Sequence, residues 1–380
     1  MIVFNKPHLT GKEVHYTYDA IYTGKLSGNG KYTKLCQDFF ETKYGFKKTL
    51  LTTSCTDALE MCAMLIDIQP GDEVIVPSYT FVSTALAFVR QGAKIIFADS
   101  CSNNPNLDVS KVASLITSKT KAVVPVHYAG VAVDMDALIQ LADKHGIYVI
   151  EDAAQAIDSY YKGKALGTIG HLSAFSFHET KNIIAGEGGL LGINDEKFIE
   201  RAEVIWEKGT NRASFFRGEV NKYGWEDIGS SFLPSESTAA FLYAQLENLE
   251  DIQNRRIYIW NRYCKAFQAL NGLVKLPNIP DYAINNAHMF YLVFKNLDER
   301  TEFIDYSKSK EILSVFHYLS LHKSPYYERN NTERPTLKNC DAFADNLVRL
   351  PLYYDMTEND IESVINMVVG FFKNDKKTFM

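Results

Sequence analysis

The chain has 380 residues, a formal net charge of −6 and a hydrophobic fraction of 46%. At roughly 150 residues per domain, this length suggests two domains. The acidic balance argues against a general nucleic-acid binder that depends on phosphate contacts, and no run reaches the roughly 18 apolar residues of a membrane helix. The six cysteines form no C-x-x-C pair, so no metal site is expected, and their sparse spacing favours a cytoplasmic protein.

Short apolar runs rich in Val and Ile recur through the first half of the chain. They lack polar alternation, which is typical of strands buried on both faces of a mainly parallel sheet. Stretches with helical spacing separate most of them, so we predict a three-layer α/β domain. The expected strands are 49–52, 73–76, 93–97, 122–126, 147–150, 172–177 and 188–193, and the expected helices are 56–66, 83–91, 109–117 and 135–145.

The last third of the chain has a different sequence pattern. A helical stretch over 237–267 would span more than about 40 Å, long enough to join two lobes. Beyond it come strands punctuated by proline, over 289–294 and 315–319, and a final amphipathic helix over 358–371. We therefore predict a large domain over residues 1–250 and a smaller α+β domain over 251–380, joined by the long helix.

A lysine beside a glycine-rich turn is the strongest local signal of chemistry. The segment 173–182 ends an expected strand, contains Lys181 and is followed by the glycines of 186–189. A lysine that is desolvated or lies near other positive charge has a lowered pKa and can form a Schiff base with an aldehyde. A solvated lysine after a strand is the alternative.

A carboxylate follows the expected strand 147–150. In open α/β sheets, ligands bind at the carboxyl ends of strands, and a pyridoxal ring needs an anion beside its nitrogen to keep it protonated. Asp152 has the chemistry for that role, and Gln155 could hydrogen-bond the phenolic oxygen of the ring. The alternative is that Asp152 only caps the next segment.

The stretch 52–60 places small hydroxylated residues between a strand and the start of a helix. Backbone N–H groups at the positive end of a helix could converge on a phosphate there. Ser176, five residues before Lys181, offers a second hydroxyl. An ordinary capping turn is the alternative.

Together these segments resemble the DegT/DnrJ/EryC1/StrS family of sugar-nucleotide aminotransferases, and the resemblance covers nearly the whole chain. It implies the aspartate-aminotransferase fold (pyridoxal phosphate fold type I), with a seven-stranded, mainly parallel sheet and pyridoxal 5′-phosphate as cofactor. The stretches that carry the resemblance are 77–84, 125–130, 151–155, 176–181 and 349–352.

The resemblance also implies a role for each candidate residue. Lys181 would carry the cofactor and move a proton between the cofactor and the substrate carbon. Asp152 would hold the ring nitrogen, Gln155 the phenolic oxygen, and Phe81 would stack on the ring. The phosphate would be held by Cys55, Thr56 and Ser176, and the substrate sugar would be contacted by Tyr32, His317 and Tyr318.

Two positions depart from the family pattern. Many relatives have glycine at the position of Cys55, so the phosphate turn must tolerate a side chain. Many also have an asparagine that reaches the phosphate from the partner subunit, and the matching position here is Leu233. We expect a homodimer with shared active sites, in which groups near 208–212 or 230–235 replace that contact.

The implied reaction moves an amino group from glutamate to the 4-keto group of dTDP-4-keto-6-deoxyglucose, giving dTDP-4-amino-4,6-dideoxygalactose for a surface polysaccharide. Family members that make this product resemble the chain most in the sequences of three stretches, 66–73, 209–212 and 227–231. A C3 aminotransferase acting on a dTDP-3-keto-6-deoxyhexose is the alternative, and glutamine is an alternative donor. Lys181 argues against a dehydratase, in which the lysine is replaced. A regulator would need a DNA-binding helix-turn-helix, for which we expect no room at either terminus.

Overall fold

Seven strands form one central sheet, as the sequence predicts, in the order β1-β9-β8-β5-β4-β2-β3. The computed structural model describes the backbone of residues 1–378 and the side-chain environments of residues 1–373. Strands β3, β2, β4, β5 and β8 run parallel, whereas β9 is antiparallel to both β8 and β1. The strands are β1 (Lys48–Thr52), β2 (Glu73–Pro77), β3 (Lys94–Ala98), β4 (Thr120–Val123), β5 (Tyr148–Asp152), β8 (Leu172–Ser176) and β9 (Gly189–Ile193).

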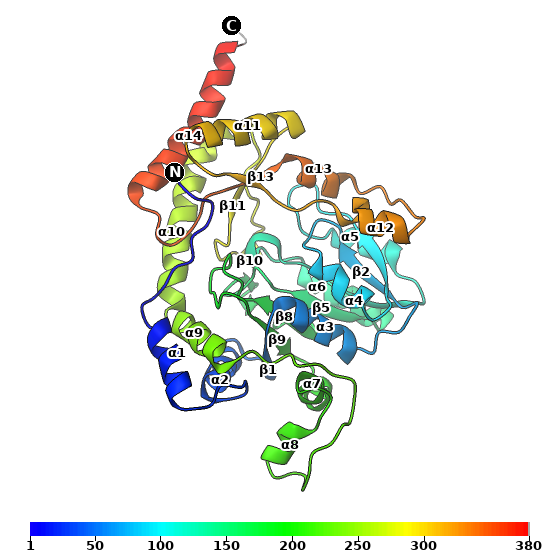
Figure 1. Ribbon diagram of the computed structural model, residues 1–380. Helices are drawn as coiled ribbons and strands as arrows, with labels where there is room; N and C mark the ends of the chain where they lie inside the picture. The colour runs from blue at the N-terminus through cyan, green and yellow to red at the C-terminus, as the bar shows by residue number, and fades with distance from the viewer. Residues whose placement is uncertain (379–380) are drawn as a thin grey trace.

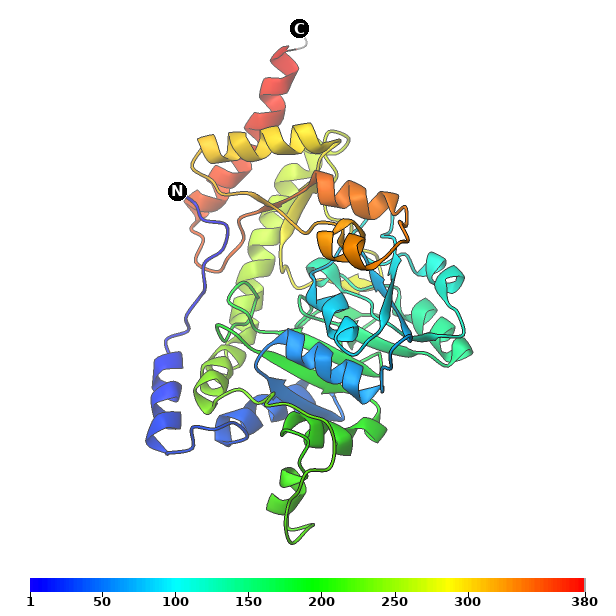
Figure 2. The same ribbon diagram turned by 45° about the vertical axis from the view of Figure 1, so that its right-hand side comes forward.

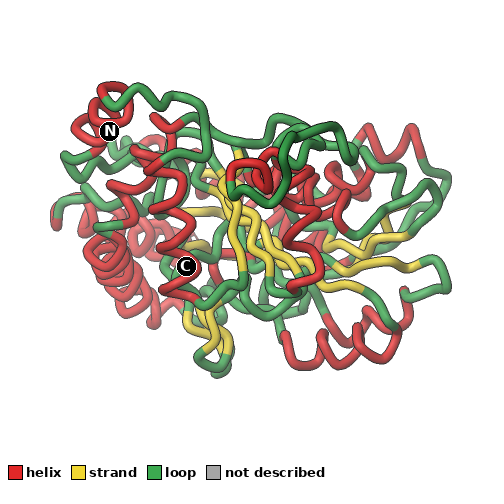
Figure 3. Tube along the Cα trace, turned by 90° about the horizontal axis from the view of Figure 1, so that it is seen from below, coloured by secondary structure: helices red, strands yellow, loops and turns green. Residues whose placement is uncertain are grey.

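Helices cover this sheet on both faces, which confirms the predicted three-layer architecture (Figure 1, Figure 3). The predicted helix over 109–117 is the least regular, because α5 ends after one turn and continues as a 3₁₀ turn over Ala113–Leu115. The helices before and around the sheet are α1 (Glu13–Tyr22), α2 (Lys31–Tyr44), α3 (Cys55–Leu65), α4 (Ser83–Val89), α5 (Val109–Val112), α6 (Met135–His145), α7 (Ile199–Trp206) and α8 (Arg212–Phe216).

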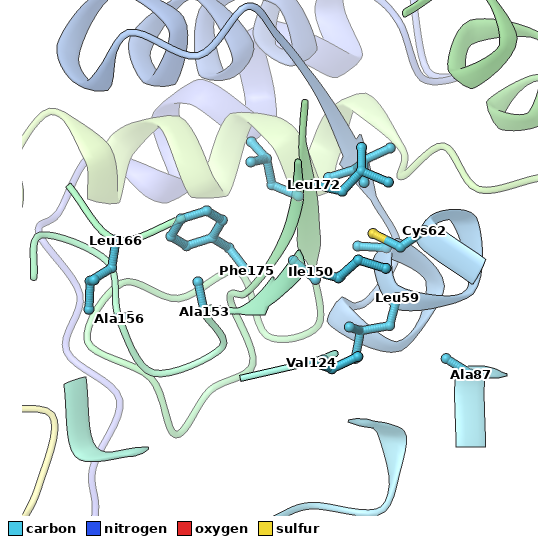
Figure 4. Close-up of a cluster of buried hydrophobic side chains, with 14 of the residues drawn as sticks. Leu59, Cys62, Ala87, Val124, Ile150, Ala153, Ala156, Leu166, Leu172 and Phe175 are labelled. Carbon is cyan, nitrogen blue, oxygen red and sulfur yellow. The ribbon is translucent and has the colours of Figure 1, made fainter. Parts of the chain in front are cut away.

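The main core lies between the sheet and helix α3. Leu59 and Cys62 on α3 face Ile150 and Leu172 on β5 and β8, and all four side chains are buried (Figure 4). Ser54 caps the helix, since its side chain accepts a hydrogen bond from the N–H of Asp57. This packing and this cap fix where α3 begins, at the edge of the sheet where the parallel strands end.

The predicted long helix over 237–267 is wrong as a continuous element. The structure has two helices, α9 (Glu236–Leu246) and α10 (Leu249–Phe267), separated by two residues. Asn248 ends the first helix: its backbone leaves the helical region, and its side-chain amide donates to the carbonyl of Ala244. Asparagine competes for backbone hydrogen bonds in this way, which favours a break.

A second hydrophobic cluster lies beyond α10, between α10, β11 and the last helix. Its sheet has the antiparallel order β11-β13-β12. Figures 1 and 2 place this part above the central sheet, with the C-terminal helix extending away from the body. The elements are β11 (Phe290–Val293), α11 (Leu297–Ser309), β12 (Val315–Phe316), α12 (Pro325–Asn330), α13 (Lys338–Asn346), β13 (Leu347–Leu350) and α14 (Glu358–Thr378).

A small third sheet of order β10-β6-β7 lies apart from the other two sheets. Its strands are β6 (Tyr160–Tyr161), β7 (Lys164–Ala165) and β10 (Ala283–Ile284). In residues 1–378, no helix has both the length and the apolar character needed to cross a membrane. The division into two domains near residue 250 stays a prediction.

Candidate active site

A cavity of about 510 Å³ opens where the parallel strands of the central sheet end. Loops that follow β1, β2, β5 and β8 meet there, which is the expected ligand position in an open α/β sheet. Nine of the ten predicted site residues line it: Cys55, Thr56, Phe81, Asp152, Gln155, Ser176, Lys181, His317 and Tyr318.

Asp152, the last residue of β5, is held as a buried acceptor. Its Oδ2 accepts a hydrogen bond from Thr84 Oγ1 at 2.7 Å, and its Oδ1 accepts from the N–H of Ala154 at 3.1 Å. Burial raises the pKa of this carboxyl, while these two hydrogen bonds and the charge of Lys181 oppose that rise. The carboxyl is therefore fixed in orientation and ready to pair with a cationic donor in the cavity.

Lys181 follows the turn after β8, where its N–H donates to the carbonyl of His178. Burial lowers the pKa of its ammonium, the nearby Cys55 and Asp152 raise it, and the charge of Arg349 lowers it further. A lysine with a lowered pKa has a larger fraction of the neutral amine, which is the nucleophile toward a carbonyl.

Both the amide oxygen and the amide nitrogen of Gln155 form hydrogen bonds. Its Oε1 accepts from the N–H of Ala129 at 2.6 Å, and its Nε2 donates to the hydroxyl of Tyr318 at 3.0 Å. Tyr318 itself has a left-handed backbone (φ 36°), and its ring stacks on His317 with centroids 3.5 Å apart. A strained residue in the lining of a cavity is a common feature of functional sites.

The turn between β1 and α3 presents free backbone donors. The N–H groups of Cys55 and Thr56 occupy the first turn of α3, where no helical acceptor exists for them. Thr56 Oγ1 lies 2.7 Å from Ser83 Oγ, which adds hydroxyls to the same corner. A Cβ on Gly189 would come within 2.5 Å of the Cys55 nitrogen, so only glycine lets β9 approach this turn.

Tyr32 is the predicted site residue that the structure places elsewhere. It lies in α2 with only 3% of its surface exposed, and its hydroxyl donates to Asp19 at 2.8 Å. Its ring packs against Tyr16 and Tyr243. The helical spacing of α2 turns this side chain into the contact with α1 and α9, so the structure does not support the predicted sugar contact.

Several lining residues were not assigned roles from the sequence. Thr84 lies in the stretch 77–84, which carries part of the family resemblance, but its hydrogen bond to Asp152 depends on how α4 packs. Phe4, His288 and Arg349 come from the N-terminal segment and from the part of the chain beyond α10. Arg349 belongs to the stretch 349–352, and that stretch is the only sequence signal that could have indicated it.

These residues match the chemistry of pyridoxal phosphate. The first-turn N–H groups of α3 and neighbouring hydroxyls suit a phosphate, the oriented carboxylate of Asp152 suits a protonated pyridine, and the amine of Lys181 suits the aldehyde. We call the turn over residues 54–56 the phosphate corner, and the close approach of Gly189 to the backbone of Ser54 and Cys55 holds it in place. When bound, the cofactor supplies an electron sink for the carbon that gains or loses the amino group.

Comparisons with known proteins agree with this chemistry. The model of the DegT/DnrJ/EryC1/StrS aminotransferase family matches residues 7–369. Spore coat polysaccharide biosynthesis protein SpsC of Bacillus subtilis (strain 168) is 34% identical over 381 residues, covering 97% of each chain. DesV of S. venezuelae has a TM-score of 0.89 at 27% identity, over 97% of this chain and 98% of that chain.

The putative sugar aminotransferase Spr1654 from Streptococcus pneumoniae shares the fold, with a TM-score of 0.91 over 98% of this chain and 99% of that chain at 23% identity. It has been solved in a PLP form and a PMP form. The fold and the cavity thus define an enzyme, a pyridoxal-phosphate-dependent sugar aminotransferase. The chain belongs to the DegT/DnrJ/EryC1/StrS aminotransferase family.

Proposed function

We propose that the enzyme transfers an amino group from glutamate to C4 of dTDP-4-keto-6-deoxyglucose, giving dTDP-4-amino-4,6-dideoxygalactose. The observation that carries the transfer chemistry is the convergence of Lys181 and Asp152 on one cavity beside the free N–H groups of α3. The name of the Bacillus subtilis relative supports a product destined for a polysaccharide. The six unpaired cysteines support a reducing, cytoplasmic setting.

Each of the nine predicted site residues that line the cavity has a proposed task. Lys181 would hold the cofactor and carry the proton that the substrate carbon gains or loses. Asp152, fixed by Thr84 and the Ala154 N–H, would keep the ring nitrogen protonated. Phe81, with 56% of its surface exposed, is free to stack on the ring. Cys55, Thr56 and Ser176 would hold the phosphate, Gln155 the phenolic oxygen, and His317 and Tyr318 the sugar.

The choice of C4 rests on three stretches that the structure brings together outside this cavity. Arg201 binds Asp67 in the first stretch and Asp227 in the third, at 2.6 and 2.7 Å. Gly209, in the second stretch, accepts hydrogen bonds from the N–H groups of Glu226 and Asp227. These stretches form one unit away from Lys181, so they do not reach the sugar bound beside it. We therefore propose that they influence the sugar bound in the partner subunit's site.

A shared site requires a dimer, and the surface near this unit supports one. Large apolar side chains are exposed on the segment 216–228, with Trp225 at 85% and Ile228 at 73%. Exposed apolar patches of this kind mark protein interfaces. Beside them lies a second cavity of about 760 Å³, lined by Lys208, Arg212, Ser231, Leu233 and Ser235. Since none of these residues lines the Lys181 cavity, we propose that they serve the partner's phosphate or sugar.

The test of the substrate is a direct comparison of ketosugars. Purified enzyme with glutamate is given the 4-keto and the 3-keto dTDP-sugar separately, and kcat/KM is measured for each. A ketone must lie about 3–3.5 Å from the reacting nitrogen to be productive, so a shift of one ring atom changes the product. We expect the 4-keto sugar to be preferred. A preference of about tenfold or more for the 3-keto sugar would establish the C3 alternative instead.

A further inference from the structure

A serine, a histidine and an aspartate from distant parts of the chain meet at the end of β2. Ser78 follows β2, His322 lies in the 3₁₀ turn Leu321–Lys323, and Asp341 lies in α13. The Oγ of Ser78 is 2.7 Å from Nδ1 of His322, and Nε2 of the same ring is 3.5 Å from an oxygen of Asp341. Hydrolases use these three residue types to activate a serine. Ser78 is completely buried, so no substrate reaches its hydroxyl, and the contact has a structural task.

The hydrogen-bond roles of this pair follow from the backbone. The N–H of His322 donates to Oγ of Ser78 at 3.2 Å, so the hydroxyl proton is free to point at Nδ1. Burial lowers the pKa of His322, although Asp341 opposes that effect, and a neutral imidazole has one N–H and one acceptor nitrogen. Nδ1 is then the acceptor, and Nε2 carries its proton toward Asp341. The pair therefore joins the end of β2 to the turn at His322 through both the main chain and the side chain.

Further hydrogen bonds from the end of β2 hold the segment of residues 317–322. The carbonyl of Ser78 accepts from the N–H of Leu321 at 3.0 Å. The hydroxyl of Tyr79 donates to the carbonyl of His317 at 3.0 Å. Together with the contact between the serine hydroxyl and the imidazole, these bonds attach the segment 317–322 to the end of β2 at both of its ends.

This segment carries the two residues proposed to contact the sugar. His317 and Tyr318 line the cavity of Lys181. The hydroxyl of Tyr128 lies 2.7 Å from Nδ1 of His317, and Gln155 donates to the hydroxyl of Tyr318 at 3.0 Å. These bonds hold the two side chains, but they do not hold the main chain from which the side chains extend. The main chain of the segment is held by the end of β2.

The backbone between the two ends needs such support. Tyr318 has a left-handed conformation (φ 36°), which costs energy and persists only where the surroundings hold it. Leu319, the next residue, has 70% of its surface exposed, so its side chain adds little packing. A stretch with few buried contacts opens readily. The bonds to Ser78 and Tyr79 therefore decide where the backbone of the segment lies.

We propose that Ser78 and His322 are positioning residues, whose contact holds the segment 317–322 in place and so sets how His317 and Tyr318 face the ketosugar. Neither Ser78 nor His322 lines the cavity, so both act through the residues that do. This assignment rests on the sugar contacts in the proposed function. It predicts that the half of the reaction that uses the ketosugar depends on the pair, and that the half that uses the amino acid does not.

Single-turnover experiments on the cofactor-loaded, full-length enzyme measure the two halves separately. In Ser78→Ala we expect the ketosugar concentration for half-maximal rate to rise about tenfold, because a buried hydrogen bond is lost, and the glutamate concentration to change less than about threefold. Ser173→Ala is the matched control. Ser173 is also fully buried, but its hydroxyl has no hydrogen-bond partner within residues 1–373, and it does not line the cavity. This variant should leave both halves unchanged.

Variants of the histidine give an independent check. His322→Asn places an amide near the position of Nδ1, so it can keep the bond to Ser78, whereas His322→Ala removes it. We expect the half-maximal ketosugar concentration to stay within about threefold of wild type in His322→Asn and to rise about tenfold in His322→Ala. Since both residues act through one contact, adding Ser78→Ala to His322→Ala should cause no further loss. Additive losses would show that the two residues do not act as a pair.

Hydrogen exchange follows the segment without any substrate. The amides of residues 317–322 should exchange at least about tenfold faster in Ser78→Ala than in wild type, and at the wild-type rate in Ser173→Ala. Calorimetry adds a measure of binding. We expect dTDP-glucose, which has no ketone, to bind about tenfold more weakly to Ser78→Ala than to wild type. Because dTDP has no sugar, it should bind equally to both.

Unchanged exchange over residues 317–322 in Ser78→Ala would overturn the assignment. So would faster exchange with an unchanged ketosugar step, or an equal loss in both halves, which would indicate a general loss of structure. Should Ser78→Ala fail to fold, the comparison of His322→Asn with His322→Ala carries the same tests. A wild-type enzyme that accepts no dTDP-ketosugar would instead contradict the proposed function. This is seen before any variant is made, and hydrogen exchange still decides whether the pair holds the segment.

Discussion

At the residue scale, burial moves Lys181 and Asp152 toward their neutral forms, because it lowers the pKa of the amine and raises the pKa of the carboxyl. Asp152 must be charged to stabilise a protonated pyridine nitrogen, and its hydrogen bonds from Thr84 and Ala154 favour that form. We predict that Asp152→Asn keeps the cofactor but lowers kcat by about 10²–10³.

The measurement is steady-state kinetics together with the cofactor content of the purified variant. Glu151→Gln is the matched control, since Glu151 is the adjacent buried carboxylate. It binds His127 and the N–H groups of residues 167, 169 and 170 rather than the cavity. It should lose stability with the cofactor chemistry intact. Full activity in Asp152→Asn would contradict the assigned role.

Lys181 should also reduce the stability of the cofactor-free protein. Its pKa is lower in the folded chain than in the unfolded chain, whose value is near 10.5. The unfolded state therefore binds more protons, and this contribution to stability rises with pH. The penalty is present at pH 7 and disappears above pH 10.5. We predict that cofactor-free Lys181→Met melts at a higher temperature than wild type at pH 7, with the gap narrowing as pH rises.

Thermal unfolding at several pH values checks this prediction. The control is Lys119→Met, at an exposed lysine, which should leave the melting temperature nearly unchanged at every pH. An equal melting temperature for wild type and Lys181→Met at pH 7 would show that the buried amine costs the fold nothing.

The individual residues show what the sequence can predict about a site. Lys181 follows a strand, Asp152 ends one and Cys55 begins a helix, so their positions depend on local structure that apolar runs reveal. Arg349 reaches the same cavity from a separate sheet, in which β13 pairs with β11 and β12, so its place depends on the packing of distant parts of the chain. Tyr32 lies away from this cavity because its ring packs against Tyr16 and Tyr243, which come from helices whose packing no spacing in α2 reveals.

At the scale of elements, the contact between β9 and the start of α3 holds the phosphate corner. A Cβ on Gly189 would collide with the backbone of Ser54 and Cys55, which cannot move without shifting the first turn of α3. We predict that Gly189→Ala weakens cofactor binding and costs about 1–3 kcal/mol of stability. Gly188→Ala is the control, because its Cβ would meet only side chains, the nearest being Ala185 at 3.3 Å.

Cofactor affinity from absorbance titration and stability from denaturant unfolding measure both effects. Equal cofactor affinity in the two glycine variants would rule out this contact as the support of the phosphate corner. The sequence showed the glycines but not their partner, since β9 and α3 are more than 120 residues apart in the chain.

The elements themselves were largely predictable. Runs of Val and Ile marked the strands of the central sheet, because a strand buried on both faces has no polar positions to obscure it. The break between α9 and α10 was missed because Asn248 interrupts an otherwise favourable helical composition. Single polar residues that end a helix through their own hydrogen bonds are weak signals against a long periodic pattern.

At the scale of the whole molecule, the exposed apolar segment 216–228 should lie at a subunit interface. We predict a homodimer in solution. We expect Ile228→Asp to raise the dissociation constant of this dimer at least about tenfold, because the interface would bury the new carboxylate away from water. Activity should fall in parallel because the site is shared. Leu297→Asp, at an exposed leucine on α11, is the control and should leave both unchanged.

Sedimentation equilibrium combined with activity assays at matched concentrations follows both quantities. A wild-type enzyme that is fully active as a monomer would contradict the shared site, and the roles proposed for Leu233 and its neighbours would fall with it.

The central claim is that the enzyme transfers nitrogen from an amino acid to a sugar carbon, with Lys181 holding the cofactor and moving the proton. Its most direct test incubates wild type and Lys181→Ala with ¹⁵N-glutamate and dTDP-4-keto-6-deoxyglucose and locates the label by NMR. We predict ¹⁵N at C4 in the galacto configuration with wild type. With Lys181→Ala we predict no turnover, although the variant still holds cofactor through the phosphate corner. Labelled sugar from Lys181→Ala at the wild-type rate, or no label in the sugar with wild type, would contradict this account.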